Sequence, residues 1–120
     1  MICKEFGNLN DAQIKAVLQL TFQLIASANY GVFSEKDDPS IDVMMNSLGF
    51  SGTLFSNLGN VYWNDAMNMS PVEAFRIVSM FDDGKKHAFK KAIIAVADKD
   101  NSVLRHDIAR QIFTKTNISY

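Results

Sequence analysis

Oxygen-bearing side chains gather between residues 98 and 107, and their spacing suits the binding of a hard cation. Asp98, Asp100 and Ser102 alternate along the chain, and Asp107 follows five residues later. Cations such as Ca²⁺, Mg²⁺ and Mn²⁺ prefer oxygen ligands, which carboxylates, a hydroxyl and the carbonyl groups of a turn supply. Asp98, Asp100 and Asp107 are therefore a candidate site for a divalent cation.

Two positions distinguish this segment from the calcium-binding loop of an EF-hand. That loop needs Gly at its sixth position and a bidentate Glu at its twelfth, where this chain has Val103 and Ala109. In a second interpretation, Asp98 and Asp100 shape and cap a turn, while Asp107 favours the N-terminal end of the next helix. We favour this second interpretation because one turn supplies only three carboxylates.

No other set of side chains indicates catalysis. His87, His106 and Cys3 do not have the spacing of a zinc site. Cys3 lies in an N-terminus that we expect to fray, and His106 is expected to be an exposed residue at a helix start. The chain has no glycine-rich phosphate loop and no nucleophile elbow. We therefore predict a non-catalytic protein, with a metal-assisted hydrolytic enzyme that uses the same acidic turn as the alternative.

The composition is typical of one small globular domain covering residues 1–120. With 48% apolar and 21% charged residues, the chain has material for one hydrophobic core and is not expected to be disordered. Its net charge of −1 provides no field that would drive it onto nucleic acid or an anionic membrane. The sequence shows neither a membrane span nor a signal peptide, and its single cysteine suits a reducing compartment, so we expect a cytoplasmic protein.

Apolar side chains recur at helical spacing through most of the chain, and no stretch alternates as a strand does. The predicted fold is therefore all-α, a compact bundle of six to seven helices. The helix starting near Asn10 or Asp11 is apolar on so many sides that we expect it to be central. The pattern predicts helices over residues 11–28, 39–48, 83–97 and 105–116, one bent helix within 51–69, and one that begins at Pro71.

Two of these predicted helices have more detailed expectations. Ser70 and Glu73 have the spacing of a capping box around Pro71. The helix that follows is expected to bury Val72, Phe75, Val78 and Phe81. In the segment 51–69, the helical period follows Leu54, Leu58, Val61 and Ala66, with the bend near Gly59.

Residues 11–48 and 82–116 repeat one pattern, in which a long apolar helix, a turn and a shorter amphipathic helix follow one another. The pattern predicts two helical hairpins that pack about a pseudo-twofold axis. The alternative is that the two stretches are alike only because every helical bundle contains helix-turn-helix units.

The second copy resembles the TerB-like (tellurite-resistance) family. Ala97 and Asp98 match an Ala-Asp pair at the turn, Leu104 matches the apolar residue after it, and Asp107 stands for the usual Glu. The resemblance implies an all-α fold built from this repeat and a role in tellurite and stress-response systems. It also implies that the turn acids bind a divalent cation.

The first copy, LIASANYGVFSEKD, matches the same family less well. Asn29 replaces the turn Asp, and either Glu35 or Asp37 takes the place of the later acid. The resemblance therefore implies a weaker cation site in this copy, with Asn29 and Asp37 as its candidate ligands.

Two surface features remain as candidates for contact with partners. The segment 43–72 contains Asp65 as its only charged residue, and this depletion indicates a protein-contact surface, although core packing explains part of it. Four lysines of the helix 83–97 favour a solvated helix face over nucleic-acid binding, because no aromatic side chains are interleaved with them. The charge-poor segment includes Phe50, Phe55, Tyr62, Trp63, Met67 and Met69, and the four lysines are Lys85, Lys86, Lys90 and Lys91.

Overall fold

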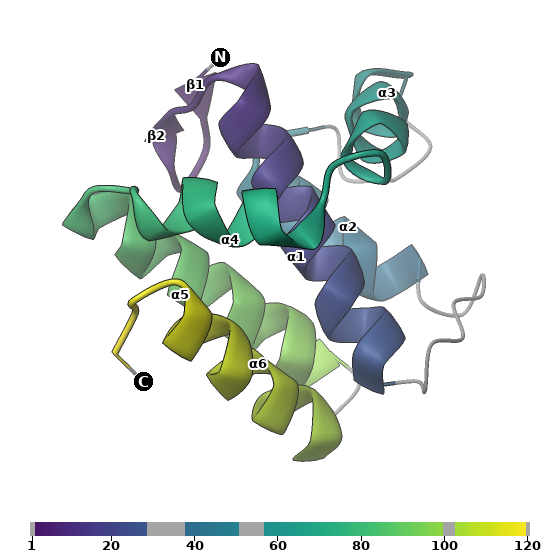
Figure 1. Ribbon diagram of the computed structural model, residues 1–120. Coiled ribbons are helices and arrows are strands. Elements are labelled where there is room, and N and C mark those ends of the chain that lie inside the picture. The colour runs from purple at the N-terminus through teal and green to yellow at the C-terminus, as the bar shows by residue number, and fades with distance from the viewer. Residues whose placement is uncertain (1, 29–37, 51–56, 100–102, 120) are drawn as a thin grey trace.

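The computed structural model of the chain describes residues 2–28, 38–50, 57–99 and 103–119. These residues form six helices and one pair of two-residue antiparallel strands, so the all-α prediction is confirmed (Figure 1). The elements are β1 (Ile2–Cys3), β2 (Gly7–Asn8), α1 (Asp11–Ala28), α2 (Asp38–Ser47), α3 (Asn57–Ala66), α4 (Pro71–Ser79), α5 (Asp83–Lys99) and α6 (Val103–Lys115).

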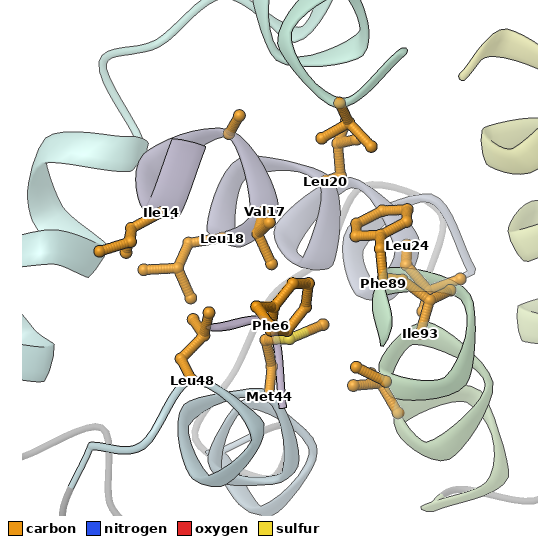
Figure 2. Packing of buried hydrophobic residues seen from close by; sticks show 14 of the residues in the cluster. Phe6, Ile14, Val17, Leu18, Leu20, Leu24, Met44, Leu48, Phe89 and Ile93 are labelled. Atoms are coloured by element: carbon orange, nitrogen blue, oxygen red, sulfur yellow. The ribbon is translucent and has the colours of Figure 1, made fainter. Parts of the chain in front are cut away.

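Helix α1 is the central helix, as its apolar surface predicts, and it contacts each of the five other helices. Asn10 caps its N-terminus: the Asn10 side-chain oxygen accepts a hydrogen bond from the Gln13 N–H (2.8 Å), and the Gln13 side chain accepts one from the Asn10 N–H (3.0 Å). The predicted inward face of α1 is buried, and Figure 2 shows Val17, Leu18 and Leu24 of this helix within the core.

A buried amide holds the end of α3 against α1. The Gln19 side chain is 3% exposed, and its nitrogen donates hydrogen bonds to the carbonyls of Ala66 (2.7 Å) and Met69 (2.8 Å). Buried amides need such partners because an unsatisfied donor or acceptor is costly. Since Met69 lies two residues before α4 begins, Gln19 also fixes the point from which α4 starts.

Helix α2 buries Ile41, Met44, Met45 and Leu48, as its spacing predicts. It ends in a Schellman motif, in which the Phe50 N–H donates to the Met45 carbonyl and the Gly49 N–H donates to the Asn46 carbonyl. Gly49 has a φ of +82°, and a Cβ at this position would lie 3.2 Å from the Lys4 nitrogen. Both facts explain why glycine closes this helix.

The N-terminal hairpin is part of the core, and the prediction that it frays is wrong. Cys3 and Leu9 are each 1% exposed, and Phe6 points toward Met44 of α2 and Leu48 just after this helix (Figure 2). The Glu5 N–H also donates to the Ser47 carbonyl at the end of α2. The apolar side chains of this hairpin cover the core beside α2, and burial raises the pKa of the Cys3 thiol.

The two predicted hairpins, α1 with α2 and α5 with α6, pack against each other crosswise. The long helix α1 contacts the short helix α6, and the long helix α5 contacts the short helix α2. A pseudo-twofold axis that relates the two hairpins would require both of these contacts. The internal repeat itself stays a prediction.

Helix α4 differs from the prediction at its outer face. Ser70 has the extended backbone of an N-cap, but its side chain makes no capping hydrogen bond, and the Glu73 carboxylate is bonded to Arg76 instead of turning back to the Ser70 N–H, so the predicted capping box does not form. Val72 is 76% exposed, whereas Ala74 and Val78 are fully buried. The small Ala74 side chain lets α4 approach α1 closely along the face that it shares with Val78.

Helix α3 also departs from the predicted period. Val61 is 56% exposed, whereas Ala66 is buried as its period predicts and Trp63 takes a further inward position. Gly59 lies in the first turn of α3 and does not interrupt it. Leu54 lies outside the described residues.

Candidate functional site

The predicted cation ligands lie at the junction of α5 and α6. Helix α5 continues to Lys99, so Asp98 belongs to its last turn, and Asp107 is the fifth residue of α6. Asp107 is therefore too far along α6 to favour its first turn, which corrects that part of the second interpretation. Asp100 lies outside the described residues, as do Asn29 and Asp37 of the first copy.

Asp98 and Asp107 have different basic partners. The Asp98 Oδ1 lies 2.8 Å from the His106 Nε2, a contact that joins the end of α5 to α6. The Asp107 Oδ1 lies 3.8 Å from the Arg110 Nη1, one turn further along α6. Within the described ranges, no group of three or more His, Cys, Asp or Glu side chains gathers as metal ligands do. His106 is partly buried by its contact with Asp98, so the prediction of an exposed histidine is wrong.

A buried arginine that the sequence reading missed lies at the same junction. Arg105 is 1% exposed, and its Nη1 donates hydrogen bonds to the Ser40 hydroxyl (2.8 Å) and to the Val96 carbonyl (3.1 Å). These bonds connect α6 to the start of α2 and to α5. The sequence held a signal for this burial, because Arg105 shares a helical face with the buried Ala109 and Ile112. Arg105 thus supplies a fixed positive charge close to the acidic turn.

A groove of about 310 Å³ lies between α1, α4 and α6. Its apolar residues include Val72, which is 76% exposed, and the half-buried Phe75 and Ile108. We call it the α1–α4–α6 groove, and its lining residues are Gln23, Ser27, Pro71, Val72, Phe75, Ile108, Gln111, Ile112 and Lys115.

Lys115 carries the only charge among these nine lining residues. Its Nζ lies 5.0 Å from the centroid of the Phe75 ring, within the range of a cation–π contact. This contact places a positive charge over an aromatic face at one end of the groove. The groove therefore combines an apolar surface with a single cation and contains no carboxylate.

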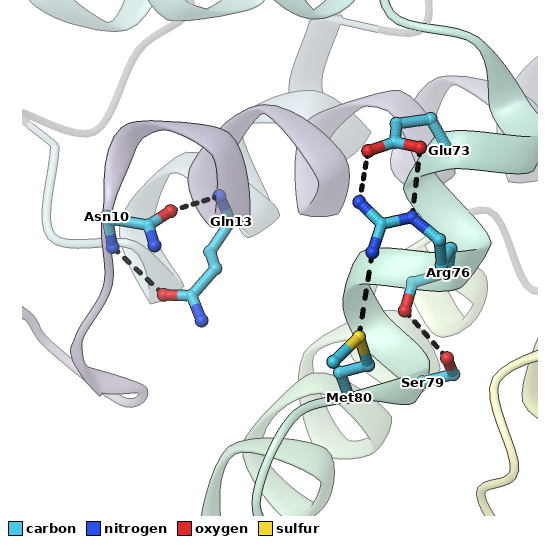
Figure 3. A network of polar contacts seen from close by, with 6 residues as sticks. All are labelled: Asn10, Gln13, Glu73, Arg76, Ser79 and Met80. Atoms are coloured by element: carbon cyan, nitrogen blue, oxygen red, sulfur yellow. Dashed lines mark hydrogen bonds and ion pairs between the residues drawn. The ribbon is translucent and has the colours of Figure 1, made fainter.

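A second hollow, of about 380 Å³, separates the start of α1 from α4, and its polar groups bond to one another (Figure 3). The Arg76 guanidinium makes two hydrogen bonds to the Glu73 carboxylate and a longer contact of 3.6 Å to the Met80 sulfur. Hydrogen bonds from Arg76 lower the pKa of Glu73, and the same contact raises the pKa of Arg76. These charges neutralise each other and do not offer a free group for catalysis.

The lysines of α5 hold neighbouring parts of the chain. The Lys85 ammonium group lies 3.1 Å from the Asp82 carboxylate. Lys86 and Lys90 donate to the carbonyls of Asn117 (3.4 Å) and Ser119 (2.7 Å). The lysine face thus fixes the segment that follows α6, a structural use that needs no nucleic acid.

In the described part of the charge-poor segment 43–72, the aromatic side chains pack in or against the core. Phe50 and Trp63 are buried, and Tyr62 is half-buried with its ring centroid 5.5 Å from that of Phe50. The Tyr62 hydroxyl donates a hydrogen bond of 2.6 Å to Asp11, which raises the pKa of Tyr62 to about 12. Pro71 and Val72, at the end of the segment, also line the α1–α4–α6 groove. Phe55 lies outside the described residues.

Comparisons of the chain with family models, with curated proteins and with solved structures find no match. None of the helices in the described part of the chain is long and apolar enough to cross a membrane.

Proposed function

We propose that this chain is a non-catalytic interaction domain that binds a segment of another protein in the α1–α4–α6 groove. The observation that carries the proposal is the exposure of Val72 beside the half-buried Phe75 and Ile108. Apolar surface that is concave and rimmed by polar side chains is typical of binding sites. The polar lining residues here are Gln23, Ser27, Gln111 and Lys115.

The chemistry of the groove supports binding over catalysis. Lys115 is the only titratable side chain in the lining, so the groove lacks the acid–base pair that a hydrolytic site needs. At the alternative site, Asp98 and Asp107 contact His106 and Arg110, two different partners. The metal-assisted enzyme is for these reasons the less favoured proposal.

The resemblance to the TerB-like family adds a cellular role to the proposal. It implies a scaffold in a stress response, and we place this scaffold in the cytoplasm on the basis of the sequence. It also implies a divalent cation at Asp98, Asp100 and Asp107, which we favour less than a structural role for these acids and which is independent of the groove, because the groove shares no residue with that turn.

Site-specific photo-crosslinking tests the proposal directly. A benzophenone side chain placed at Val72 in cells that express the chain should yield discrete crosslinked products. The same probe at His87, an exposed position of α5 outside the groove, is the matched control and should not yield them. Excess unlabelled domain should compete for these products, and a Val72→Glu domain should not. Identical products from both positions would contradict the proposal.

A further inference from the structure

We infer that the segment bound by the α1–α4–α6 groove is an amphipathic helix that carries a carboxylate beside its apolar residues. This inference rests on the proposed function and adds the chemistry and the conformation of the partner. Three features of the groove support this inference: the positive charge of Lys115, the helical spacing of the residues in its walls, and the hydrogen bonding of its backbone within helices.

The charge of the groove favours an acidic partner. Lys115 is the only charged lining residue, and its position over the Phe75 ring holds the ammonium group at the groove. The nearby carboxylates of Glu73 and Asp107 do not line the groove, and each contacts an arginine of its own helix. The first turn of α4 lines the groove too, and the positive end of its dipole has the same sign as Lys115.

The walls of the groove have the spacing that receives a helix. On α6 the lining positions are Ile108, Gln111, Ile112 and Lys115, which recur at three and four residues and span about two turns, or roughly 10 Å. Opposite them, Val72 and Phe75 stand on α4. A helix with apolar residues at the same three- and four-residue spacing would place them between these two rows.

The backbone of the groove disfavours an extended peptide. Both walls and the floor are helical, so their N–H and C=O groups are largely bonded within their own helices. An extended peptide would find no sheet edge here and would leave its own backbone groups without protein partners. A helical partner arrives with these groups already bonded.

A second copy of the chain fits the groove less well. A copy that presents the same surface brings its own Lys115, and two ammonium groups repel each other. The partner we infer carries the opposite charge, so its carboxylate reaches Lys115 while its apolar residues contact Val72 and Phe75.

Selection from a library of displayed random 16-residue peptides tests this inference. The bait is the full chain, in parallel with the variants Lys115→Glu and Val72→Glu and the control Lys91→Glu, which changes the same charge on the exposed face of α5. Circular dichroism first establishes that each variant is folded. Individual enriched peptides are then synthesised, and their dissociation constants and helicity on binding are measured.

The inference predicts enriched peptides with apolar residues at helical spacing and an acid beside them. Lys115→Glu should weaken the affinity of such a peptide about tenfold, because the reversed charge repels the carboxylate of the peptide. Lys91→Glu should change the affinity less than twofold. Val72→Glu should abolish binding. A gain in peptide helicity on binding completes the expected result.

Other outcomes separate the inference from the proposed function. Peptides that lose binding with Val72→Glu but show no acidic preference, or bind extended, overturn the inference and leave the groove as a docking site. The inference is overturned if the enriched peptides bind the Val72→Glu variant as well as the wild type, or if no peptide is enriched. In either case, the crosslinking at Val72 remains the test of the proposed function. Sedimentation that reveals a dimer dissociated by Val72→Glu assigns the groove to a second copy and also overturns the inference.

Discussion

The acidic junction of α5 and α6 and the α1–α4–α6 groove differ in how their side chains are used. At the junction, Asp98 and Asp107 contact His106 and Arg110, and Arg105 is buried nearby with bonds to Ser40 and Val96. In the groove, an apolar residue that its spacing assigns to the core is 76% exposed. The comparison teaches that Asp98 and Asp107 at the junction have basic partners, whereas Val72 leaves apolar surface exposed beside the groove.

The largest expected effect concerns Arg105, whose guanidinium group is the buried positive charge at the junction. Arg105→Ala should lower the free energy of unfolding by about 3 kcal/mol, because it leaves a cavity and removes the hydrogen bonds to Ser40 and Val96. Urea unfolding of the variant and of the wild type measures the difference. The control is Arg110→Ala on the exposed face of α6, for which a loss below about 0.5 kcal/mol is expected. Equal losses in the two variants would show that Arg105 does not anchor the junction.

The two faces of α4 provide a second, smaller test. Val78→Ala should cost about 2 kcal/mol of unfolding free energy, because Val78 is fully buried against the core. Val72→Ala, the same chemical change on the groove side, should cost less than about 0.5 kcal/mol. Thermal or urea unfolding distinguishes the two. If Val72→Ala destabilised the protein as much as Val78→Ala, Val72 would be a core residue and the groove would lose its exposed apolar side chain.

The hydrogen bond between Tyr62 and Asp11 predicts a titration. The bond raises the pKa of Tyr62 to about 12 in the folded protein from a reference value of 10.0, so its contribution to stability is complete below pH 10 and is lost as the pH rises through 12. Absorbance at 295 nm should show one tyrosine that ionises well above the other two. Asp11→Ala, which removes the acceptor, should bring that tyrosine toward its ordinary pKa, and an unchanged titration would show that the bond does not form.

The smallest expected effect is that of added cations. Millimolar Ca²⁺, Mg²⁺ or Mn²⁺ should leave the melting temperature unchanged, because Asp98 and Asp107 are held by separate basic partners. A cation at about a hundred times its dissociation constant would add roughly 2.7 kcal/mol and raise the melting temperature by several degrees. If such a rise occurred and disappeared in Asp98→Asn and Asp107→Asn, the junction would be a cation site.

Much of the fold could be predicted from the sequence because it depends on local patterns. The apolar spacing predicted a central helix over residues 11–28, and this helix is α1. The burial of Cys3 could not be predicted, because it depends on the contact of the N-terminal hairpin with α2.

The candidate site was less predictable than the fold. Val72 fits the helical period of α4, and only the packing of Ala74 and Val78 on α1 decides that it faces outward. Partners such as Asp98 and His106 are eight residues apart and meet only because α5 and α6 form a hairpin. Lys115 and Phe75 are forty residues apart, so no local pattern connects them.

Amide chemical shifts measured during titration with the segment crosslinked at Val72 test the central claim most directly. The account predicts that the shifts which change will belong to Gln23, Phe75, Ile108 and their neighbours in the groove. The amides around His106 should stay unchanged. Chemical-shift changes centred on the junction of α5 and α6, with none in the groove, would contradict the account. The acidic turn would then be the better candidate for the functional site.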